Sequence, residues 1–385
     1  MARTRNGKRL KPDAGAGGAD RISALPDELL HHMLSFLPAR DAVRSCVLSS
    51  RWRDVWRSSP VVRITRSSDR WRSPQHLNKF VNGLLLLRRP VLLREFELET
   101  FRYIPRSIVR GVAAGGKFND SEEPLRYVEL WMAYAINFHV EVLRVWVRSL
   151  TRPLKLVQMP LASQHLTTLE LECVVLCRRA LDFSRCPVLE DLKMRSCRFT
   201  AVSKLSSPSV KRLCITNCQF DYQFRTCISA PGLVLLQLRS TSGWTPVLES
   251  MPLLVTASVA LDIFCSDNSR HDDCGDCHSG ACLNCYGVRD GSDKSVLLRG
   301  LSNATHLALE AELGVRVFKL DMTWCPTFSK LKTLVLDGWD LDSDFHTALL
   351  RFLEHAPILE KLTLELREER FMSIEEICSP VEQLV

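Results

Sequence analysis

Between residues 20 and 60, apolar residues recur at helical spacing, and proline and polar residues punctuate three short segments. Pro26 suits the opening position of the first helix and Pro38 ends it. One face of that helix carries Leu29, Leu30, Met33, Leu34 and Leu37. Asp41 suits the N-cap of a second helix, and Ser49 or Ser50 that of a third. We therefore expect three short helices, each too short to be stable alone, which need burial against another element or another protein.

Beyond residue 90 the apolar pattern changes to a repeated unit, Leu-x-x-Leu-x-Leu-x-x-Cys, in which x is any residue. Complete copies begin at Leu189 and Val210 and end at Cys197 and Cys218. Further copies begin at Leu93, Leu125, Leu166, Leu233, Leu254, Ala304, Leu331 and Leu359. Starts from residue 166 to residue 254 lie 23, 21, 23 and 21 residues apart, within the period of leucine-rich repeats, about 20 to 29 residues. The pattern predicts an α/β solenoid with a parallel sheet on its concave face, in which the final Cys of a copy turns inward.

A segment rich in Gly, Asp and Ser, residues 263–295, interrupts the repeats as an insertion. It contains two Cys-x-x-Cys pairs, Cys274 with Cys277 and Cys282 with Cys285. Two residues between cysteines let both sulfurs reach one tetrahedral zinc ion. Only four residues separate the pairs, however, where about 15 to 20 is usual. Structural zinc, a redox pair and a metal-free insertion all stay open, and the neighbouring aspartates favour the metal-free one.

Short motifs in the three-helix segment carry a family resemblance. The order and spacing of four motifs resemble those of an F-box in its plant form. The motifs are Leu25-Pro26, Leu37-Pro38, the run Ser45 to Ser49, and Arg51-Trp52. Together with the repeats, the segment resembles the plant F-box proteins with leucine-rich repeats, some of which carry a further C-terminal FBD domain. Because the chain stops soon after Phe371, we expect that domain to be short or missing.

The resemblance implies a function without catalysis. The F-box would dock on a Skp-type adaptor and through it on a cullin, and the repeats would bind the target protein of an SCF-type ubiquitin ligase. The adaptor contacts implied are Leu25, Pro26, Leu29, Met33, Leu34, Leu37, Pro38, Val43, Cys46, Leu48 and Trp52. The alternative is a non-catalytic interaction scaffold whose F-box does not engage a ligase.

These patterns divide the chain into parts that we expect to fold differently. They are a flexible basic tail (1–19), the F-box (20–60), a linker helix region (61–90), the repeat solenoid (91–367) and a C-terminal tail (368–385).

Composition excludes several other classes of protein. Of the 385 residues, 46% are hydrophobic and 25% charged, which is near the average of globular domains. No apolar run approaches the roughly 18 residues of a membrane helix, and no secretory signal follows the basic N-terminus. We therefore expect an intracellular protein, in the nucleus or the cytoplasm, with its 15 cysteines mostly as free thiols and without a membrane partner.

Charge and motifs give no sign of an enzyme or of a nucleic-acid partner. The 51 basic residues are offset by 44 acidic ones, so no strong overall field attracts nucleic acid. The chain has no Gly-rich phosphate loop, no Gly-x-Ser-x-Gly elbow and no His-Glu-x-x-His pair. We expect no catalytic residue and no cofactor other than the zinc considered above.

Overall fold

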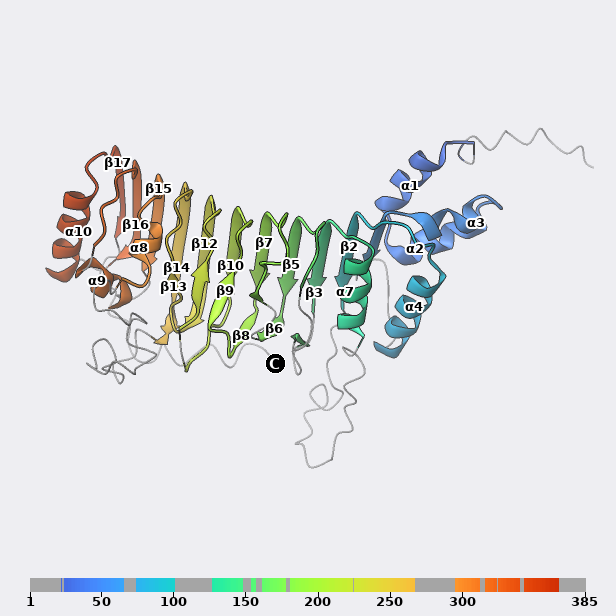
Figure 1. Cartoon of the computed structure of the whole chain (residues 1–385), viewed down its shortest axis with the longest axis horizontal. Helices are drawn as coiled ribbons and strands as arrows, with labels where there is room; N and C mark the ends of the chain where they lie inside the picture. The colour runs from blue at the N-terminus through green and yellow to red at the C-terminus, as the bar shows by residue number, and fades with distance from the viewer. Residues whose placement is uncertain are drawn as a thin grey trace, which may run out of the picture.

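The computed structural model describes residues 22, 24–65, 74–100, 127–147, 154–156, 161–177, 181–223, 225–266, 295–311, 316–323, 325–339 and 343–366. These residues form an α/β structure in which a group of helices adjoins one end of a large parallel sheet (Figure 1). Among the described helices, none combines the length and the apolar character needed to cross a membrane.

Short helices form the N-terminal end, as predicted. They are α1 (Asp27–Ser35), α2 (Ala39–Arg44), η1 (Ser45–Val47), α3 (Trp52–Val55) and η2 (Trp56–Ser58). The predicted caps are wrong, because α2 begins directly after Pro38 and α3 directly after Arg51. Asp41 instead lies in the first turn of α2, where its charge complements the helix dipole.

The large sheet joins its strands in chain order, and all neighbouring strands are parallel. It consists of β1 (Val61–Ile64), β2 (Glu95–Glu99), β3 (Val142–Trp146), β5 (Thr168–Glu172), β7 (Asp191–Arg195), β10 (Arg212–Thr216), β12 (Leu235–Gly243), β14 (Thr256–Cys265), β15 (His306–Ala311), β16 (Thr333–Trp339) and β17 (Lys361–Leu366). Parallel neighbours require a crossover between each strand and the next. After each strand, the chain therefore crosses back to the end of the sheet at which the strands begin.

The crossovers carry two small parallel sheets and several helices. One small sheet holds β4 (Leu154–Leu156), β6 (Val174–Cys177) and β8 (Arg198–Thr200), and the other holds β9 (Lys204–Ser206), β11 (Cys227–Ser229) and β13 (Val247–Leu248). The helices are α4 (Pro74–Leu87), α7 (Val128–Asn137), α8 (Leu298–Leu301), α9 (Arg316–Thr323) and α10 (Ser343–His355).

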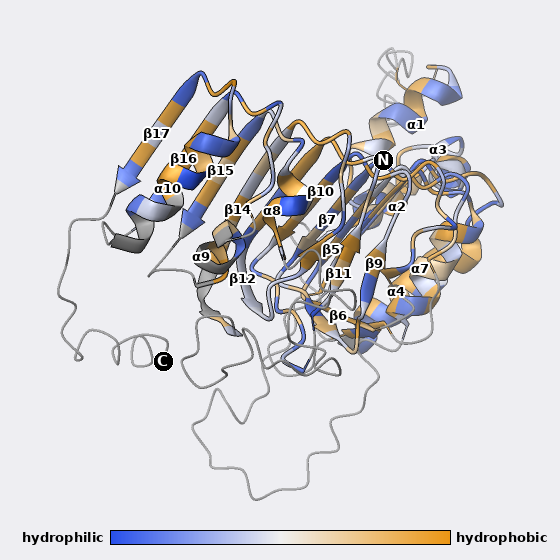
Figure 2. Cartoon of the chain, turned by 60° about the vertical axis from the view of Figure 1, so that its left-hand side comes forward, coloured by the Kyte–Doolittle hydropathy of each residue, from blue (hydrophilic) through white to orange (hydrophobic). Residues whose placement is uncertain are grey.

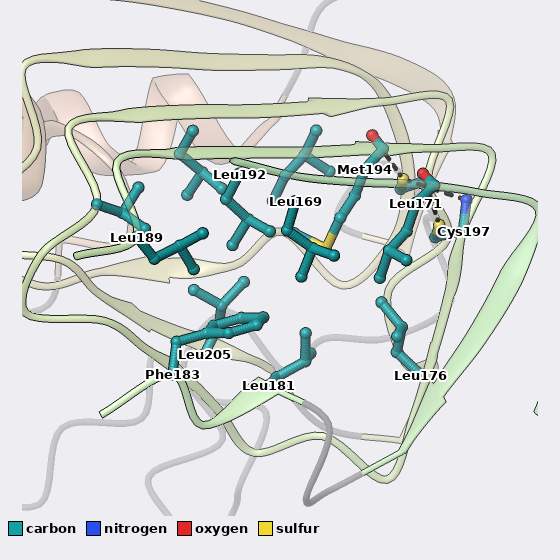
Figure 3. Packing of buried hydrophobic residues seen from close by; sticks show 14 of the residues in the cluster. Leu169, Leu171, Leu176, Leu181, Phe183, Leu189, Leu192, Met194, Cys197 and Leu205 are labelled. Carbon is teal, nitrogen blue, oxygen red and sulfur yellow. Dashed lines mark hydrogen bonds between the residues drawn. The ribbon is translucent and has the colours of Figure 1, made fainter. Parts of the chain in front are cut away.

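Side chains alternate between the two faces of the large sheet, so that one face is apolar and the other polar. Figure 2 shows this alternation as successive blue and orange bands along β15, β16 and β17. On the inner face, leucines such as Leu169, Leu192 and Leu213 have no exposed surface, and Figure 3 shows part of this core. Burial of about 0.8 kcal/mol per methylene makes this face the main source of stability.

The Cys that ends each complete repeat turns inward, as predicted. Where the regular pairing of β5, β7, β10 and β12 ends, one residue has a positive φ and the next residue is buried. The positive-φ residues are Cys173, Ser196, Asn217 and Ser240. The buried residues that follow them are Val174, Cys197, Cys218 and Thr241, in the same order. The Cys197 Sγ lies 3.5 Å from the carbonyl oxygen of Leu171, and the Cys197 N–H donates to the Cys218 Sγ at 3.3 Å (Figure 3). A side-chain hydrogen bond with the Cys218 thiol and burial raise the pKa of the Cys197 thiol.

Two sequence expectations about strands are wrong. The copy expected at Leu125 does not form a strand at its next apolar positions, because Val128, Trp131, Met132 and Ala135 have helical spacing and are buried in α7. The strand of this repeat is β3, which lies further along the chain. The region 61–90, expected to be a linker helix region, holds α4 but also β1, the first strand of the sheet.

Candidate functional site

Helix α1 has two apolar stripes, and they face in different directions. Leu30 and Leu34 are 0% and 1% exposed and belong to the core. Leu29 and Met33 are 49% and 43% exposed on the same helix. A helix needs one apolar stripe to pack on its own domain, so the second one is available to a partner.

Further exposed apolar side chains lie on the same group of helices. We call the set the helical-end surface, and it comprises Ile22, Leu29, Met33, Phe36, Leu37, Val47 and Leu48. Apolar side chains of this size, gathered on consecutive short elements, are typical of the core of a protein interface.

The predicted adaptor contacts fall into three groups in the structure. The exposed group comprises Pro26, Leu29, Met33, Leu37 and Leu48. The half-buried group comprises Leu25, Pro38, Val43 and Cys46. Leu34 and Trp52 are only 1% and 4% exposed, because both side chains pack in the chain's own core, and their contact with an adaptor stays a prediction.

Sequence reasoning missed Ile22, Phe36 and Val47, whose exposed fractions are 53%, 66% and 83%. For Phe36 a signal was present in the sequence, because it continues the spacing of Leu29 and Met33 along one helix face. For Ile22 and Val47, which lie outside α1 and α2, no periodicity distinguishes an exposed residue from a buried one.

Arginine side chains tie the helical-end surface to the sheet. The Arg51 Nη2 donates to the Asp27 Oδ1 at 2.6 Å, which joins the start of α3 to α1 and lowers the pKa of the Asp27 carboxyl. Arg63 in β1 donates to the Ser35 carbonyl oxygen of α1 and to the Glu95 Oε2 of β2 at 2.8 Å. The helices therefore have a fixed orientation relative to the sheet.

The outer face of the sheet carries a ladder of opposite charges across its first five strands. The Arg63 Nε lies 3.4 Å from the Glu97 Oε2, and Arg144 pairs with Glu95 and, at 3.4 Å, with Glu170. The Lys193 Nζ lies 2.9 Å from the Glu170 Oε1. Burial raises the pKa of the Glu97 carboxyl, and the nearby arginines oppose that rise.

A hollow of about 450 Å³ opens on this outer face. Its lining includes Trp146 of β3, Glu172 of β5, Lys193 and Arg195 of β7, and Gln237 of β12. The hollow combines an aromatic ring, both signs of charge and an amide, which suits recognition of a polar protein segment. These residues do not include a nucleophile paired with a base.

The predicted zinc ligands Cys274, Cys277, Cys282 and Cys285 lie outside the described residues. Among the residues that are described, no group of three or more His, Cys, Asp or Glu side chains is arranged to hold a metal ion. Zinc binding by the inserted segment stays a prediction. The strand β14 runs to Cys265, so the insertion begins slightly later than the expected residue 263.

Comparison with known proteins identifies an F-box domain and similar plant proteins. A model of the F-box domain matches residues 22–64. A putative F-box/FBD/LRR-repeat protein of Arabidopsis thaliana is 30% identical over 262 residues, which cover 63% of this chain and 59% of the relative. An FBD-associated F-box protein of the same plant is 47% identical over 85 residues, or 22% of this chain and 18% of the relative.

A third relative spans most of the chain. The MEIOTIC F-BOX protein MOF of Oryza sativa subsp. japonica is 28% identical over 367 residues, which cover 90% of this chain and 71% of the relative. The chain spans less than two thirds of the length of the two Arabidopsis relatives, 59% and 18%. The F-box match and these relatives agree: residues 22–64 form an F-box domain, and the chain as a whole is similar to plant F-box/LRR-repeat proteins.

Proposed function

We propose that this protein is the substrate-recognition subunit of an SCF-type cullin ubiquitin ligase. The F-box docks on a Skp-type adaptor, the sheet region binds a target protein, and the ubiquitin-transfer chemistry is supplied by the ligase. The second apolar stripe of α1 carries the proposal, because it is exposed and lies within the residues that the F-box model matches.

We also propose that residues 91–367 form a leucine-rich-repeat solenoid and that the outer sheet face is its concave, target-binding face. Three observations support this: strands joined in chain order, a repeat period of 21 to 23 residues between β5 and β14, and a buried Cys or equivalent at the end of the regular pairing of β5, β7, β10 and β12. The charges and the hollow on the outer face favour a polar, charged segment of a target protein.

Adaptor binding is tested with a double variant of the exposed stripe, Leu29→Asp with Met33→Asp. Both side chains are on the surface, so the charges disrupt docking without entering the core. We expect a pull-down with a purified Skp-type adaptor to retain the wild type and to lose the double variant, since central apolar anchors contribute about 2 kcal/mol or more each.

The matched control is Leu350→Asp on α10, at the opposite end of the sheet (Figure 1). Leu350 is 61% exposed, so the control adds a charge at a comparably exposed leucine. It should bind the adaptor as the wild type does. Equal retention of the double variant and the control would refute docking through α1, and a circular-dichroism melt would show that both variants are folded.

A further inference from the structure

The C-terminal end of α4 exposes leucines that the fold does not use. One face of the helix is buried, and it carries Leu77, Val81, Leu84 and Leu85 at helical spacing. Leu86 and Leu87, by contrast, are 84% and 54% exposed, and Leu92 beyond the helix is 65% exposed. Single exposed leucines are ordinary, but these three are close together in the sequence, and we call them the α4 patch.

This patch lies next to the F-box helices. The Arg88 Nη2 donates to the Ser59 carbonyl oxygen at 2.6 Å, and the Arg89 N–H donates to the Arg57 carbonyl oxygen at 3.0 Å. These bonds join the end of α4 directly to η2 and to Ser59, the residue that follows it. Figure 1 shows α4 beside α2 and α3 at the same end of the sheet.

The charge of Arg89, next to the end of α4, also has a small effect on Asp27 in α1. The pKa of the Asp27 carboxyl is lowered mainly by the hydrogen bond from Arg51, and the positive charge of Arg89 contributes to a smaller degree. Arg89 therefore lies within electrostatic reach of the first turn of α1. The direct connections of this end of α4 are the hydrogen bonds of Arg88 and Arg89 to Ser59 and Arg57.

The size of the F-box helices leaves room for an added contact. A protein interface of standard size involves about 20 to 30 residues on each side. Helices α1 to α3 are short, and each buries one side in the core, so their exposed residues alone supply fewer. Leu86 and Val47, the most exposed of the large apolar side chains in the described part of the chain, both lie at this end.

We propose that Leu86, Leu87 and Leu92 bind the same Skp-type adaptor as the helical-end surface and extend the docking surface beyond residues 22–64. This inference rests on the proposed function. The adaptor is the occupant because the patch continues the F-box surface through the bonds of Arg88 and Arg89. The contact is apolar, bordered by the positive charge of Arg89.

The test is calorimetric titration of the full chain with a purified Skp-type adaptor, comparing wild type with Leu86→Asp plus Leu87→Asp. We expect the dissociation constant of the double variant to rise by about ten-fold or more. The control Leu350→Asp should bind within about two-fold of wild type, as exposed sites away from an interface do. A double variant that also stays within that range would overturn the inference.

A second measurement needs no variant and therefore does not depend on folding of one. Amide hydrogen exchange around residues 86–92 should slow when the adaptor is added to the wild-type chain. Unchanged exchange there, together with slowed exchange in α1, would refute the contribution of α4 and leave the proposed function intact. Absence of any adaptor binding by the wild type would remove the proposed function itself.

Discussion

At the scale of single residues, neighbouring apolar side chains of the F-box differ in whether they belong to the core or to the surface. Helical spacing reveals that α1 is apolar on more than one face, but it does not say which face packs inward. That choice depends on β1, against which α1 and α2 pack and which the sequence pattern did not predict. For this reason the pattern alone does not separate Leu34 from Leu29, although the first side chain is buried and the second exposed.

The cysteines that end the complete repeats are expected to contribute measurably to stability. Cys218→Ala removes the sulfur that accepts the Cys197 N–H and leaves that buried donor without a partner. We expect a loss of about 2 kcal/mol in the free energy of unfolding, measured by urea denaturation.

Cys214→Ala is the control, on the strand β10 that precedes Cys218. The Cys214 side chain is half-buried on the outer face, where its Sγ contacts the Gln237 Oε1 at 3.4 Å. Its replacement should cost less than about 0.5 kcal/mol. Equal losses for the two variants would contradict a special role of the inward-facing cysteine.

At the scale of elements, Asp321 fixes the place where the chain returns from the inserted segment. Its carboxylate, fully buried in α9, accepts from the N–H groups of Val296, Leu297 and Leu298 at 2.6 to 2.8 Å and from the Ser295 Oγ at 3.1 Å. These donors lie at the start of α8, where helix N–H groups lack partners within the helix. Burial raises the pKa of the Asp321 carboxyl, and the four hydrogen bonds oppose that rise.

Asp321→Asn places an amide group among donors and removes an acceptor. We expect the free energy of unfolding to fall by about 3 kcal/mol in urea denaturation. Asp337→Asn, on the outer face of β16, is the matched control and should change stability little. A loss for Asp321→Asn no larger than that of Asp337→Asn would show that α8 does not depend on this cap.

The repeat pattern predicted strands better than it predicted crossovers. Copies that begin at Leu166, Leu189, Val210, Leu233 and Leu254 coincide with β5 to β14, because strict alternation and a fixed period act together there. The pattern failed at α7, where helical spacing happens to fit the same template. It also gave no sign of the close approach of α8 to β13, where a Cβ on Gly300 would collide with the Leu248 Cβ.

At the scale of the whole molecule, the F-box and the large sheet share a strand. The F-box model ends at residue 64, and β1 (Val61–Ile64) is the first strand of the sheet. Arg63 in that strand bonds both to α1 and to β2. The docking surface and the outer sheet face are thus parts of one packed unit, which suits a receptor that must present a target at a fixed place.

The central claim is that this chain joins a ligase through its F-box end. The most direct measurement is size-exclusion chromatography with light scattering on the full chain mixed with a Skp-type adaptor and a cullin. The account predicts one species with the mass of one copy of each protein, and its loss in the variant with Leu29→Asp and Met33→Asp. Elution of the wild-type chain apart from an adaptor–cullin complex would contradict the account.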